Sequence, residues 1–326
     1  MRSDRIVVSP PMLAQFPDAF ESLRSLGLNV VHNDGAYPLS ENALAEFMDG
    51  AIAAIVGLDR VTDRVLTACP GLRVIARNGV GLDNVDIDAA TRHRVIVTAP
   101  VGANSRSVAE LTIGLIIALL RQVIPRHIDL QRGVWKRVQG SELSDKTLGI
   151  IGLGRVGQQV AKLGQGLDVR VIANDILPEI EFAARHGIPL ISLGDLLAQS
   201  DIVSLHVPLT ALTENMVNAR RLAAMKAGAY LINTSRAAIV DPYSLAVAVE
   251  QGHLAGAAVD VHFDERDKGG HAHAALIGRP NIITTPHLGA YTTESLRRTT
   301  EMAVKSIVDA LSGRIPEGLV NQDAWE

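Results

Sequence analysis

Short runs of apolar residues alternate along the chain with longer stretches that repeat hydrophobic residues at helical spacing. The apolar runs predict strands at residues 5–9, 29–32, 53–56, 73–76 and 95–98, and a second series at 147–151, 169–174, 202–206, 229–233, 257–261 and 282–285. The amphipathic stretches predict helices at residues 13–26, 157–166, 193–199, 242–251 and 294–311. Repeated strand–helix–strand order is typical of parallel sheets with helices on both faces. The pattern predicts two doubly wound α/β domains.

The join between the two series is expected at residues 99–102, where Pro100 favours an extended chain and Gly102 permits unusual dihedrals. Beyond it, Ser107 and Glu110 have the spacing of a capping box, which predicts the start of a helix. The helix over 294–311 is followed by no further strand series, and we expect it to pack on the first domain. We therefore predict a flavodoxin-like domain of residues 1–99 and 291–326, into which a Rossmann-like domain of residues 100–290 is inserted.

Composition narrows the class of protein. The 326 residues are 47% hydrophobic and 20% charged, which fits a folded protein of two domains. The net charge of -4, without any run of Lys or Arg, argues against nucleic acid as a partner. The single cysteine, Cys69, cannot form an internal disulfide and fits a reducing compartment. The apolar stretch 111–120 is too short for a membrane span and predicts a buried helix. With no secretory leader in residues 1–10, we expect a cytoplasmic protein.

The strongest local motif is GIIGLGRVG at residues 149–157, which follows a predicted strand and opens a predicted helix. Gly152 allows a tight turn, Gly154 lets the backbone approach a pyrophosphate, and Gly157 lets helix and strand pack closely. Asp175 ends the next strand, roughly 20 residues after the motif, where such an acid accepts a hydrogen bond from a ribose hydroxyl. Because residues 176–178 carry no positive charge for a 2′-phosphate, the cofactor is predicted to be NAD rather than NADP.

Three further residues follow predicted strands at their carboxyl ends: Arg236, Glu265 and His287. Each alone is typical of a solvated surface group. Together they would place a cation, an acid and an imidazole on the edge of the sheet that carries the glycine turn. Such a set can hold a carboxylate and transfer a proton.

In these motifs the sequence resembles the D-isomer-specific 2-hydroxyacid dehydrogenases, particularly the members similar to D-3-phosphoglycerate dehydrogenase. The resemblance covers nearly the whole chain and rests on RNGVGLDNVD (77–86), GANSRSVAE (102–110), the glycine motif, LHVPLT (205–210), INTSR (232–236), GAAVDV (256–261) and TPHLGA (285–290). It implies an NAD-dependent enzyme that moves a hydride between nicotinamide and C2 of a small D-2-hydroxy acid. The C-terminal regulatory domain of longer phosphoglycerate dehydrogenases is expected to be missing.

The resemblance also implies roles for individual residues. Arg236 would grip the substrate carboxylate and carbonyl oxygens, His287 would be the acid/base, and Glu265 would pair with that histidine. A substrate-carboxylate loop is implied at Asn78, Gly79, Val80 and Gly81. The implied cofactor-binding residues are Gly152, Gly154, Arg155, Val156, Gly157, Asp175, His206, Pro208, Thr234, Ser235, Asp260, Gly289 and Ala290.

Two positions depart from the family pattern, since Ala237 follows Arg236 where glycine is usual and Arg266 follows Glu265 where proline is usual. We interpret both as tuning of the site. The histidines His262, His271 and His273 lack a completing cysteine or acid, so no metal site is predicted. In the family, the region after Glu110 packs on a second subunit, which implies a homodimer.

The substrate's side group is left open by the sequence. D-3-phosphoglycerate is the first hypothesis, with Arg60 available to an anionic tail, although Arg60 is equally compatible with an ordinary solvated arginine. A glyoxylate or hydroxypyruvate reductase is the alternative. Two other functions share this fold, a dehydrogenase of formate or phosphite and a non-enzymatic NAD sensor similar to the C-terminal-binding-protein corepressors.

Overall fold

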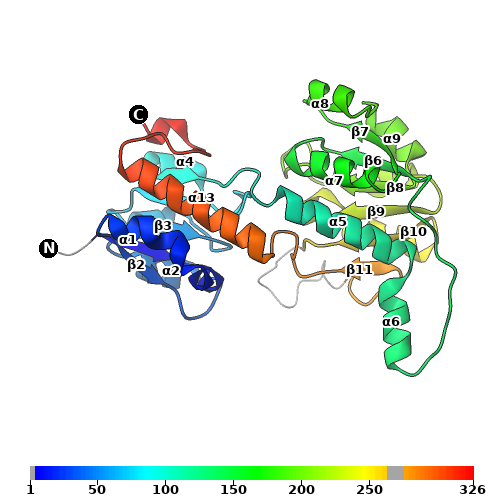
Figure 1. The fold of residues 1–326 in the computed structure, drawn as a ribbon, viewed down its shortest axis with the longest axis horizontal. Helices are drawn as coiled ribbons and strands as arrows, with labels where there is room; N and C mark the ends of the chain where they lie inside the picture. Colours follow the sequence, from blue (N-terminus) through cyan, green and yellow to red (C-terminus); the bar gives the residue numbers. More distant parts are fainter. Residues whose placement is uncertain (1–3, 263–274) are drawn as a thin grey trace. The chain divides into compact units, whose positions relative to one another are not determined.

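The computed structural model describes residues 4–262 and 275–326. The chain divides into two compact units (Figure 1). The first consists of Met1–Asn104 together with Ala290–Glu326, and the second of Ser105–Gly289. The second unit is thus inserted in sequence between the two segments of the first.

In the described part of the first unit, five parallel strands form one sheet in the order β2-β1-β3-β4-β5, the order of flavodoxin-like folds. The strands are β1 (Arg5–Val8), β2 (Asn29–His32), β3 (Ala51–Val56), β4 (Val74–Arg77) and β5 (Ile96–Thr98). All five predicted strands are confirmed, with ends shifted by at most two residues. The central strands β1, β3 and β4 are largely apolar because both faces of a parallel sheet are buried, whereas the edge strand β2 is partly exposed.

Helices cover both faces of this sheet. One face packs on α2 (Glu41–Met48), α3 (Asp63–Ala68) and α4 (Ile87–Arg92), and the other on α1 (Glu21–Ser25) and the long α13 (Thr293–Leu311). A short 3₁₀ turn, η4 (Gln322–Ala324), lies near the end of the chain. The expectation that the helix over 294–311 returns to the first unit is confirmed, because Val304 and Ile307 are buried in one cluster with Ile6 and Val8.

The prediction of one helix over residues 13–26 is wrong. That stretch forms two 3₁₀ segments, η1 (Pro11–Gln15) and η2 (Pro17–Phe20), before the short α1. Pro17 has no N–H for a helical hydrogen bond and disfavours helical dihedrals at the preceding residue, and Phe16 has φ -115° and ψ 61°. The apolar pattern is satisfied all the same, since Leu13, Phe20 and Leu23 are buried.

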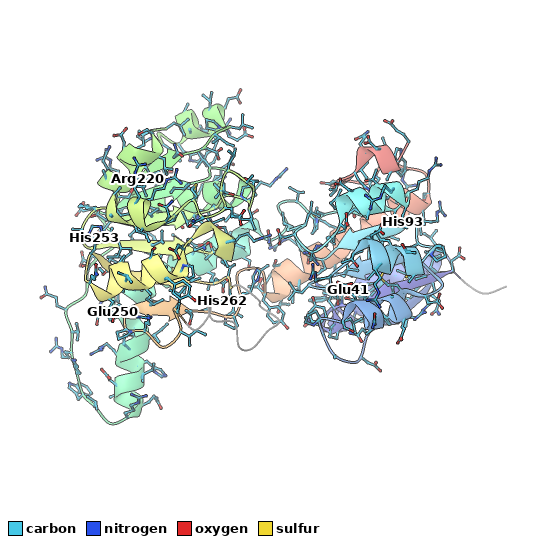
Figure 2. All side chains as sticks on the ribbon, turned by 180° about the vertical axis from the view of Figure 1, so that it is seen from behind. Glu41, His93, Arg220, Glu250, His253 and His262 are labelled. Atoms are coloured by element: carbon cyan, nitrogen blue, oxygen red, sulfur yellow. The ribbon has the colours of Figure 1, made fainter. Side chains whose placement is uncertain are left out.

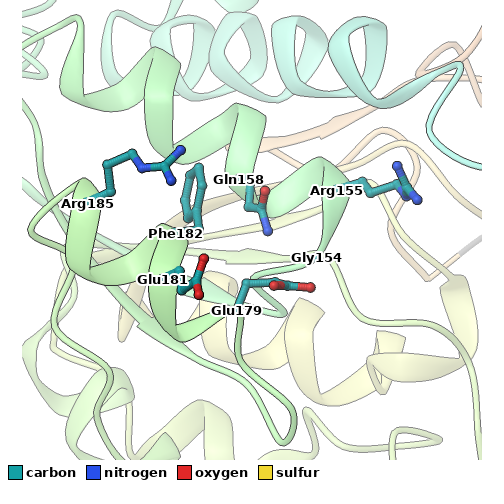
Figure 3. Close-up of a pocket in the computed structure, with 7 residues that line it drawn as sticks. All are labelled: Gly154, Arg155, Gln158, Glu179, Glu181, Phe182 and Arg185. Atoms are coloured by element: carbon teal, nitrogen blue, oxygen red, sulfur yellow. The ribbon is translucent and has the colours of Figure 1, made fainter.

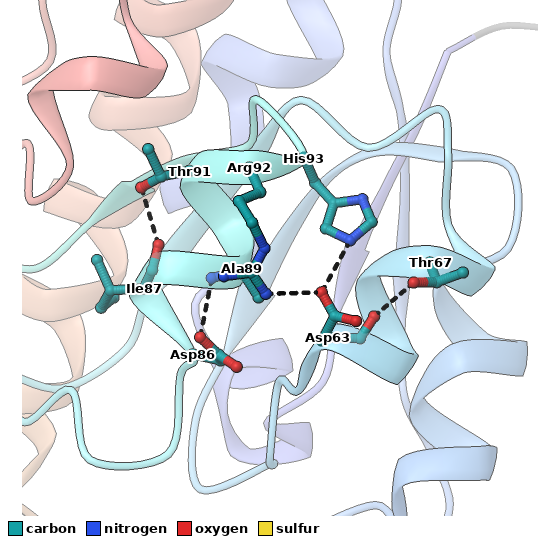
Figure 4. A network of polar contacts seen from close by, with 8 residues as sticks. All are labelled: Asp63, Thr67, Asp86, Ile87, Ala89, Thr91, Arg92 and His93. Carbon is teal, nitrogen blue, oxygen red and sulfur yellow. Dashed lines mark hydrogen bonds and ion pairs between the residues drawn. The ribbon is translucent and has the colours of Figure 1, made fainter.

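A polar contact joins the ends of α3 and α4 at the surface of the first unit (Figure 4). Asp63 Oδ1 accepts hydrogen bonds from Arg92 Nη2 at 3.1 Å and from His93 Nε2 at 3.2 Å. These two partners, Arg92 foremost, hold the pKa of the Asp63 carboxyl below its usual range. Asp86 caps α4 by accepting from the Ala89 amide at 2.8 Å.

The second unit is a larger parallel sheet in the order β11-β10-β9-β8-β6-β7 over its described residues. Its strands are β6 (Thr147–Ile151), β7 (Arg170–Asn174), β8 (Ile202–Leu205), β9 (Ala229–Asn233), β10 (Leu254–Val259) and β11 (Ile282–Thr284). Leu190 forms a single parallel bridge with Ala173 on the outer side of β7. Counted as a minimal strand, Leu190 gives the 3-2-1-4-5-6 order of the Rossmann fold, with β11 added as a seventh strand beside β10.

Two layers of helices bury this sheet. One face packs on α9 (Leu193–Gln199), α10 (Ala219–Ala223) and α11 (Pro242–Glu250), and the other on α5 (Ser105–Leu120), α7 (Arg155–Gln165) and α8 (Ile180–Arg185). Successive strand residues serve opposite layers: Leu231 lies in the first core and Ile232 in the second. The remaining elements are α6 (Val123–Gln131) and the 3₁₀ turn η3 (Ala237–Ile239).

Helix α5 confirms the buried helix predicted over 111–120 but not its predicted start. It begins at Ser105, so Ser107 and Glu110 lie within it and form no capping box. The Ser107 hydroxyl donates instead to the Gly289 carbonyl at 2.6 Å, and the Glu110 carboxylate pairs with Arg106. Among the described residues no single helix has the length and apolar content to cross a membrane. Helices α5 and α6 together have that length and composition, but they are bent by 64° relative to each other.

Candidate functional site

The glycine motif forms the turn between β6 and α7, where the order of strands reverses in the second unit. Gly152 has φ +95°, and a Cβ there would lie 2.7 Å from the His206 carbonyl oxygen. A Cβ at Gly157 would lie 2.1 Å from the Gly152 oxygen, whereas a Cβ at Gly154 would meet nothing within 4 Å. The turn is therefore tightly packed beneath Gly152 and Gly157 and open above Gly154.

The open side of the turn is also the start of α7. Gly154 is its N-cap and supplies no side-chain acceptor, while the first helical hydrogen bond runs from the Gln158 amide to the Gly154 carbonyl at 2.9 Å. The amides at Arg155 and Val156 precede that bond and point along the positive end of the helix dipole. Free amides beside an open glycine suit the two phosphates of a dinucleotide.

Asp175, at the end of β7, is tied directly to the turn. Its Oδ2 accepts from the Leu153 amide at 2.6 Å and its Oδ1 from the Leu177 amide at 2.9 Å. Each carboxylate oxygen can accept two hydrogen bonds, so both retain a lone pair for a ribose hydroxyl. The sequence did not predict this additional structural role of Asp175.

A hollow beside the turn is lined by Gly154, Arg155, Gln158, Glu179, Glu181, Phe182 and Arg185 (Figure 3). Glu179 and Glu181 bring negative charge to this hollow, and Arg155 brings positive charge beside the start of α7. Arg185 contributes a cation from α8 that the inspection of residues 176–178 could not reveal. The glycine turn and the amides of Arg155 and Val156 fit the pyrophosphate of an NAD molecule, and the Asp175 carboxylate fits its ribose hydroxyls.

At the end of β8, the backbone carbonyl of His206 contacts Gly152, and the His206 ring meets Ser204 Oγ at 2.8 Å from Nε2. Burial lowers the pKa of His206 to about 3, so the imidazole is neutral at physiological pH. Pro208 lies two residues further, and its carbonyl accepts from Thr213 Oγ1 at 2.6 Å.

The segment after β9 is a tight turn built by Asn233. Its Oδ1 accepts from the amide and the hydroxyl of Ser235, at 3.0 and 2.9 Å, and its Nδ2 donates to the Arg236 carbonyl at 2.9 Å. Thr234 and Ser235 are both buried, each with 9% of its surface exposed. Arg236 emerges from this turn, and its Nη1 donates to the Ser235 carbonyl at 2.7 Å. The side chain of Arg236 is thereby held at the carboxyl edge of the sheet.

Asp260, buried at the end of β10, organises the loop that follows β11. Its Oδ1 accepts from Thr285 Oγ1 at 2.6 Å and from the Leu288 amide at 2.8 Å, and its Oδ2 accepts from the Gly289 amide at 2.8 Å. Between these contacts His287 has the left-handed φ of +54°, a conformation that costs energy and persists only where its surroundings impose it. Asp260 therefore imposes the backbone conformation from which His287 projects.

Glu265 falls outside the described residues, as do Arg266, His271 and His273. Ala290 begins the second segment of the first unit. His262, labelled in Figure 2, lies just past β10, and its Nε2 contacts the Thr285 carbonyl at 2.9 Å. No group of His, Cys, Asp or Glu in the described parts of the chain is arranged to hold a metal ion.

The predicted carboxylate loop lies in the first unit, after β4. The Asn78 amide donates to the Val56 carbonyl at 2.8 Å and is already used by the sheet, while the Asn78 side chain donates to Thr299 Oγ1 at 2.9 Å. The amides of Gly79, Val80 and Gly81 donate no hydrogen bond to any described residue. Gly79 has φ +149°, and the three successive amides are available to an acceptor outside the described residues.

Arg77 is a residue of this loop that the sequence did not single out. It is only 5% exposed, its Nε donates to the Gly81 carbonyl at 2.9 Å, and its Nη1 donates to the Val56 carbonyl at 3.3 Å. It therefore ties Gly81, the last residue of the loop, to the end of β3. Its position directly before Asn78, as a charged residue closing an apolar strand, was the available signal.

Comparison with known proteins gives a consistent family. Residues 113–289 match the family model described as D-isomer specific 2-hydroxyacid dehydrogenase, NAD binding domain. A glyoxylate reductase of Thermofilum pendens is 36% identical over 310 residues, covering 90% of this chain and 88% of the relative. A D-3-phosphoglycerate dehydrogenase of Homo sapiens is also 36% identical over 93% of this chain, but the chain spans only 56% of its length.

Solved structures agree over the full fold. A protein from Thermus thermophilus has a TM-score of 0.86 at 36% identity, covering 97% of this chain and 99% of that one. A D-lactate dehydrogenase from Aquifex aeolicus, solved with NAD and lactic acid, has a TM-score of 0.83 at 29% identity, with coverages of 97% and 98%. These matches, together with the glycine turn at the start of α7, show that the chain belongs to the D-isomer specific 2-hydroxyacid dehydrogenase family and is an NAD-dependent oxidoreductase.

Proposed function

We propose that the protein interconverts a small 2-oxo acid and its D-2-hydroxy acid, with Arg236 and His287 acting on the substrate and Glu265 assisting His287. The observation that carries this proposal is the Asp260 clamp, which holds His287 in a left-handed backbone at the edge of the sheet that also carries Arg236 and the glycine turn. A strained histidine backbone held by three hydrogen bonds is typical of a functional position.

The chemistry follows from the residue types. The cofactor, when bound, supplies hydride transfer to C2 of the 2-oxo acid. The planar guanidinium of Arg236 can donate two parallel hydrogen bonds to the substrate carboxylate and C2 oxygen, which holds the carbonyl in place. The imidazolium of His287 gives its proton to the C2 oxygen as that oxygen gains charge, and the neutral imidazole accepts the proton back in the reverse direction. A carboxylate at Glu265 would favour the imidazolium form.

The substrate carboxylate is assigned to the loop of the first unit. The amides of Gly79, Val80 and Gly81 are without partners among the described residues, and Arg77 fixes the loop from beneath. A planar anion can accept from several such amides at once. A loop of this kind would recognise the carboxylate of a 2-oxo acid, whatever the rest of the substrate.

The tail of the substrate is proposed to be short and free of phosphate. The loop at 57–60 is joined to the segment just after the carboxylate loop by Asn84, whose Nδ2 donates to the Gly57 carbonyl at 2.9 Å. A Cβ at Gly57 would lie 2.0 Å from the Tyr37 hydroxyl, and the fully buried Asp59 carboxylate accepts from the Leu39 and Gly57 amides. A phosphate would meet a filled space and a like charge there. Arg60 is exposed, as expected for a solvated arginine.

The decisive test measures NADH oxidation with glyoxylate, hydroxypyruvate and phosphohydroxypyruvate. The unphosphorylated acids are expected to have the higher kcat/KM, and Arg60→Ala is expected to leave the ratio unchanged. A clear preference for phosphohydroxypyruvate that depends on Arg60 would contradict the proposed tail and support a phosphoglycerate dehydrogenase. No turnover with any 2-oxo acid, despite tight NADH binding, would contradict the enzymatic function.

The role of His287 has its own test. His287→Ala is expected to lower kcat by about 10²–10⁴-fold, the usual contribution of a general acid, and to leave the NADH Kd unchanged. His262→Ala is the matched control, because His262 is a second histidine at the same sheet edge, held by the Thr285 carbonyl. Equal losses in both variants would point to a structural effect on the loop and remove His287 from the proton transfer.

The assembly is proposed to be a homodimer formed through α6 and the segment after it. Apolar side chains there are exposed to a degree unusual for a monomer: Val123 at 51%, Leu130 at 56%, Val134 at 49% and Trp135 at 80%. Light scattering is expected to give twice the chain mass, and Leu130→Glu with Trp135→Glu is expected to give a monomer. A monomeric wild type at micromolar concentration would refute this assembly.

A cytoplasmic location is proposed with this function. NADH-linked reduction of small 2-oxo acids draws on an intracellular pool of NADH, which the cytoplasm supplies. Cys69 is buried, and burial raises the pKa of its thiol, which keeps it protonated and unreactive. A single thiol of this kind fits a reducing compartment. Fractionation of the producing cells should recover the protein with other cytoplasmic enzymes.

A further inference from the structure

Helix α5 supports the edge of the sheet at two places. Its Ser107 hydroxyl donates to the Gly289 carbonyl at 2.6 Å, and its Thr112 hydroxyl lies 3.1 Å from the hydroxyl of Thr234. A Cβ at Gly289 would lie 3.3 Å from a methyl group of Val108, so the helix packs directly against this segment. Thr112 is completely buried, and neither the motifs nor the proposed mechanism gives it a function.

The proton of the Thr112 hydroxyl has a definite place. Thr112 Oγ1 donates to the Val108 carbonyl at 2.8 Å, the usual bond of a threonine to the preceding helical turn. A hydroxyl has one proton, so Thr112 can only accept in its contact with Thr234. The proton of Thr234 is therefore directed to Thr112, and Thr234 has only lone pairs left for any other partner.

The other hydroxyls at this edge are arranged alike. Ser235 Oγ donates to Asn233 Oδ1 at 2.9 Å, and Thr285 Oγ1 donates to the Asp260 carboxylate at 2.6 Å. Together with that carboxylate, the edge offers acceptors and no free hydroxyl donor among these residues. An edge of this kind selects a ligand group that donates hydrogen bonds.

We propose that Thr112 is a positioning residue that makes Thr234 an obligate acceptor for the amino group of the nicotinamide carboxamide. This inference rests on the proposed function and on the cofactor-binding role that the family resemblance implies for Thr234. The carboxamide has an acceptor side and a donor side, so an acceptor-only Thr234 fixes which side faces it. That choice determines the orientation of the ring and hence the face from which the hydride leaves.

The test compares the binding of NADH with that of its 3-acetylpyridine analogue, in which a methyl group replaces the amino group. Wild type is expected to bind NADH more tightly, and Thr112→Val is expected to reduce this preference by on the order of tenfold, because the Thr234 proton loses its acceptor and its orientation. Thr112→Ser keeps the hydroxyl and is expected to restore the preference. Dissociation constants from fluorescence titration give the result without turnover.

Two further variants keep the test decisive. Thr112→Cys, which is similar in size but a weak acceptor, replaces Thr112→Val if the latter does not fold. Thr234→Val is expected to lose the same preference, and the double variant is expected to lose no more than either single one. An unchanged preference in folded Thr112→Val or Thr112→Cys would overturn the inference. Failure of the wild type to bind NADH at all would instead overturn the proposed function.

Discussion

His206 gives a prediction whose size can be worked from the structure. Burial lowers the pKa of its imidazole to about 3 in the folded chain, against about 6.5 for a solvated histidine. Because the folded pKa is depressed, the unfolded chain binds the proton first, and stability is lost as the pH falls below about 6.5. Between pH 7 and pH 5 this linkage amounts to about 2 kcal/mol for a single group. The figure is insensitive to the folded pKa as long as that pKa stays below about 4.

The perturbation is His206→Gln, which removes the titrating ring and retains a polar group beside Ser204. Urea unfolding at pH 7 and pH 5, without cofactor, gives the free energy of unfolding of each protein. The wild type is expected to lose about 2 kcal/mol more than the variant between the two pH values. His32, whose pKa is also lowered by burial and by Arg24, destabilises both proteins alike at low pH and cancels in the comparison. His127→Gln, at an exposed position on α6, should follow the wild type. Identical pH dependence in wild type and His206→Gln would refute the reasoning.

Two further predictions concern the cofactor site. Gly157→Ala should destabilise the fold by about 1–3 kcal/mol in urea unfolding, because its Cβ would overlap the Gly152 oxygen. Gly154→Ala should destabilise the fold much less, but it should weaken NADH binding in a fluorescence titration. Tight NADH binding by a stable Gly154→Ala variant would argue against the pyrophosphate lying there. Asp175→Ala should reduce the preference for NADH over NADPH, measured as the ratio of their kcat/KM values. Adding Arg185→Ala should restore part of this preference, because it removes from the hollow a cation that could bind the 2′-phosphate of NADPH. A ratio that stays at the wild-type value in Asp175→Ala would exclude Asp175 as the source of the preference.

The fold was predictable to a large extent because the relevant signals are local. Buried parallel strands must be apolar on both faces, so β1 to β11 appear as short apolar runs, and the glycine turn appears as its three glycines. Failures occurred where local pattern and backbone chemistry disagree. The spacing of apolar residues at 13–26 is helical, yet Pro17 divides the stretch into shorter segments. Ser107 and Glu110 have capping spacing, yet the helix begins earlier and Ser107 is used by Gly289.

The sequence by itself determined the order of the elements, the family and the residue types of the candidate site. Only the tertiary structure decided how those residues are held, because hydrogen bonds between distant segments have no signature in sequence spacing. Asp260 clamps the His287 loop from 28 residues away, and Thr112 meets Thr234 across 122 residues. Arg77 likewise donates to the backbone carbonyls of Gly81 and Val56, which any residue type could supply. Whether a side chain bonds to a backbone carbonyl or to a distant partner depends on where folding places both groups. That placement exists only once the two sheets have formed.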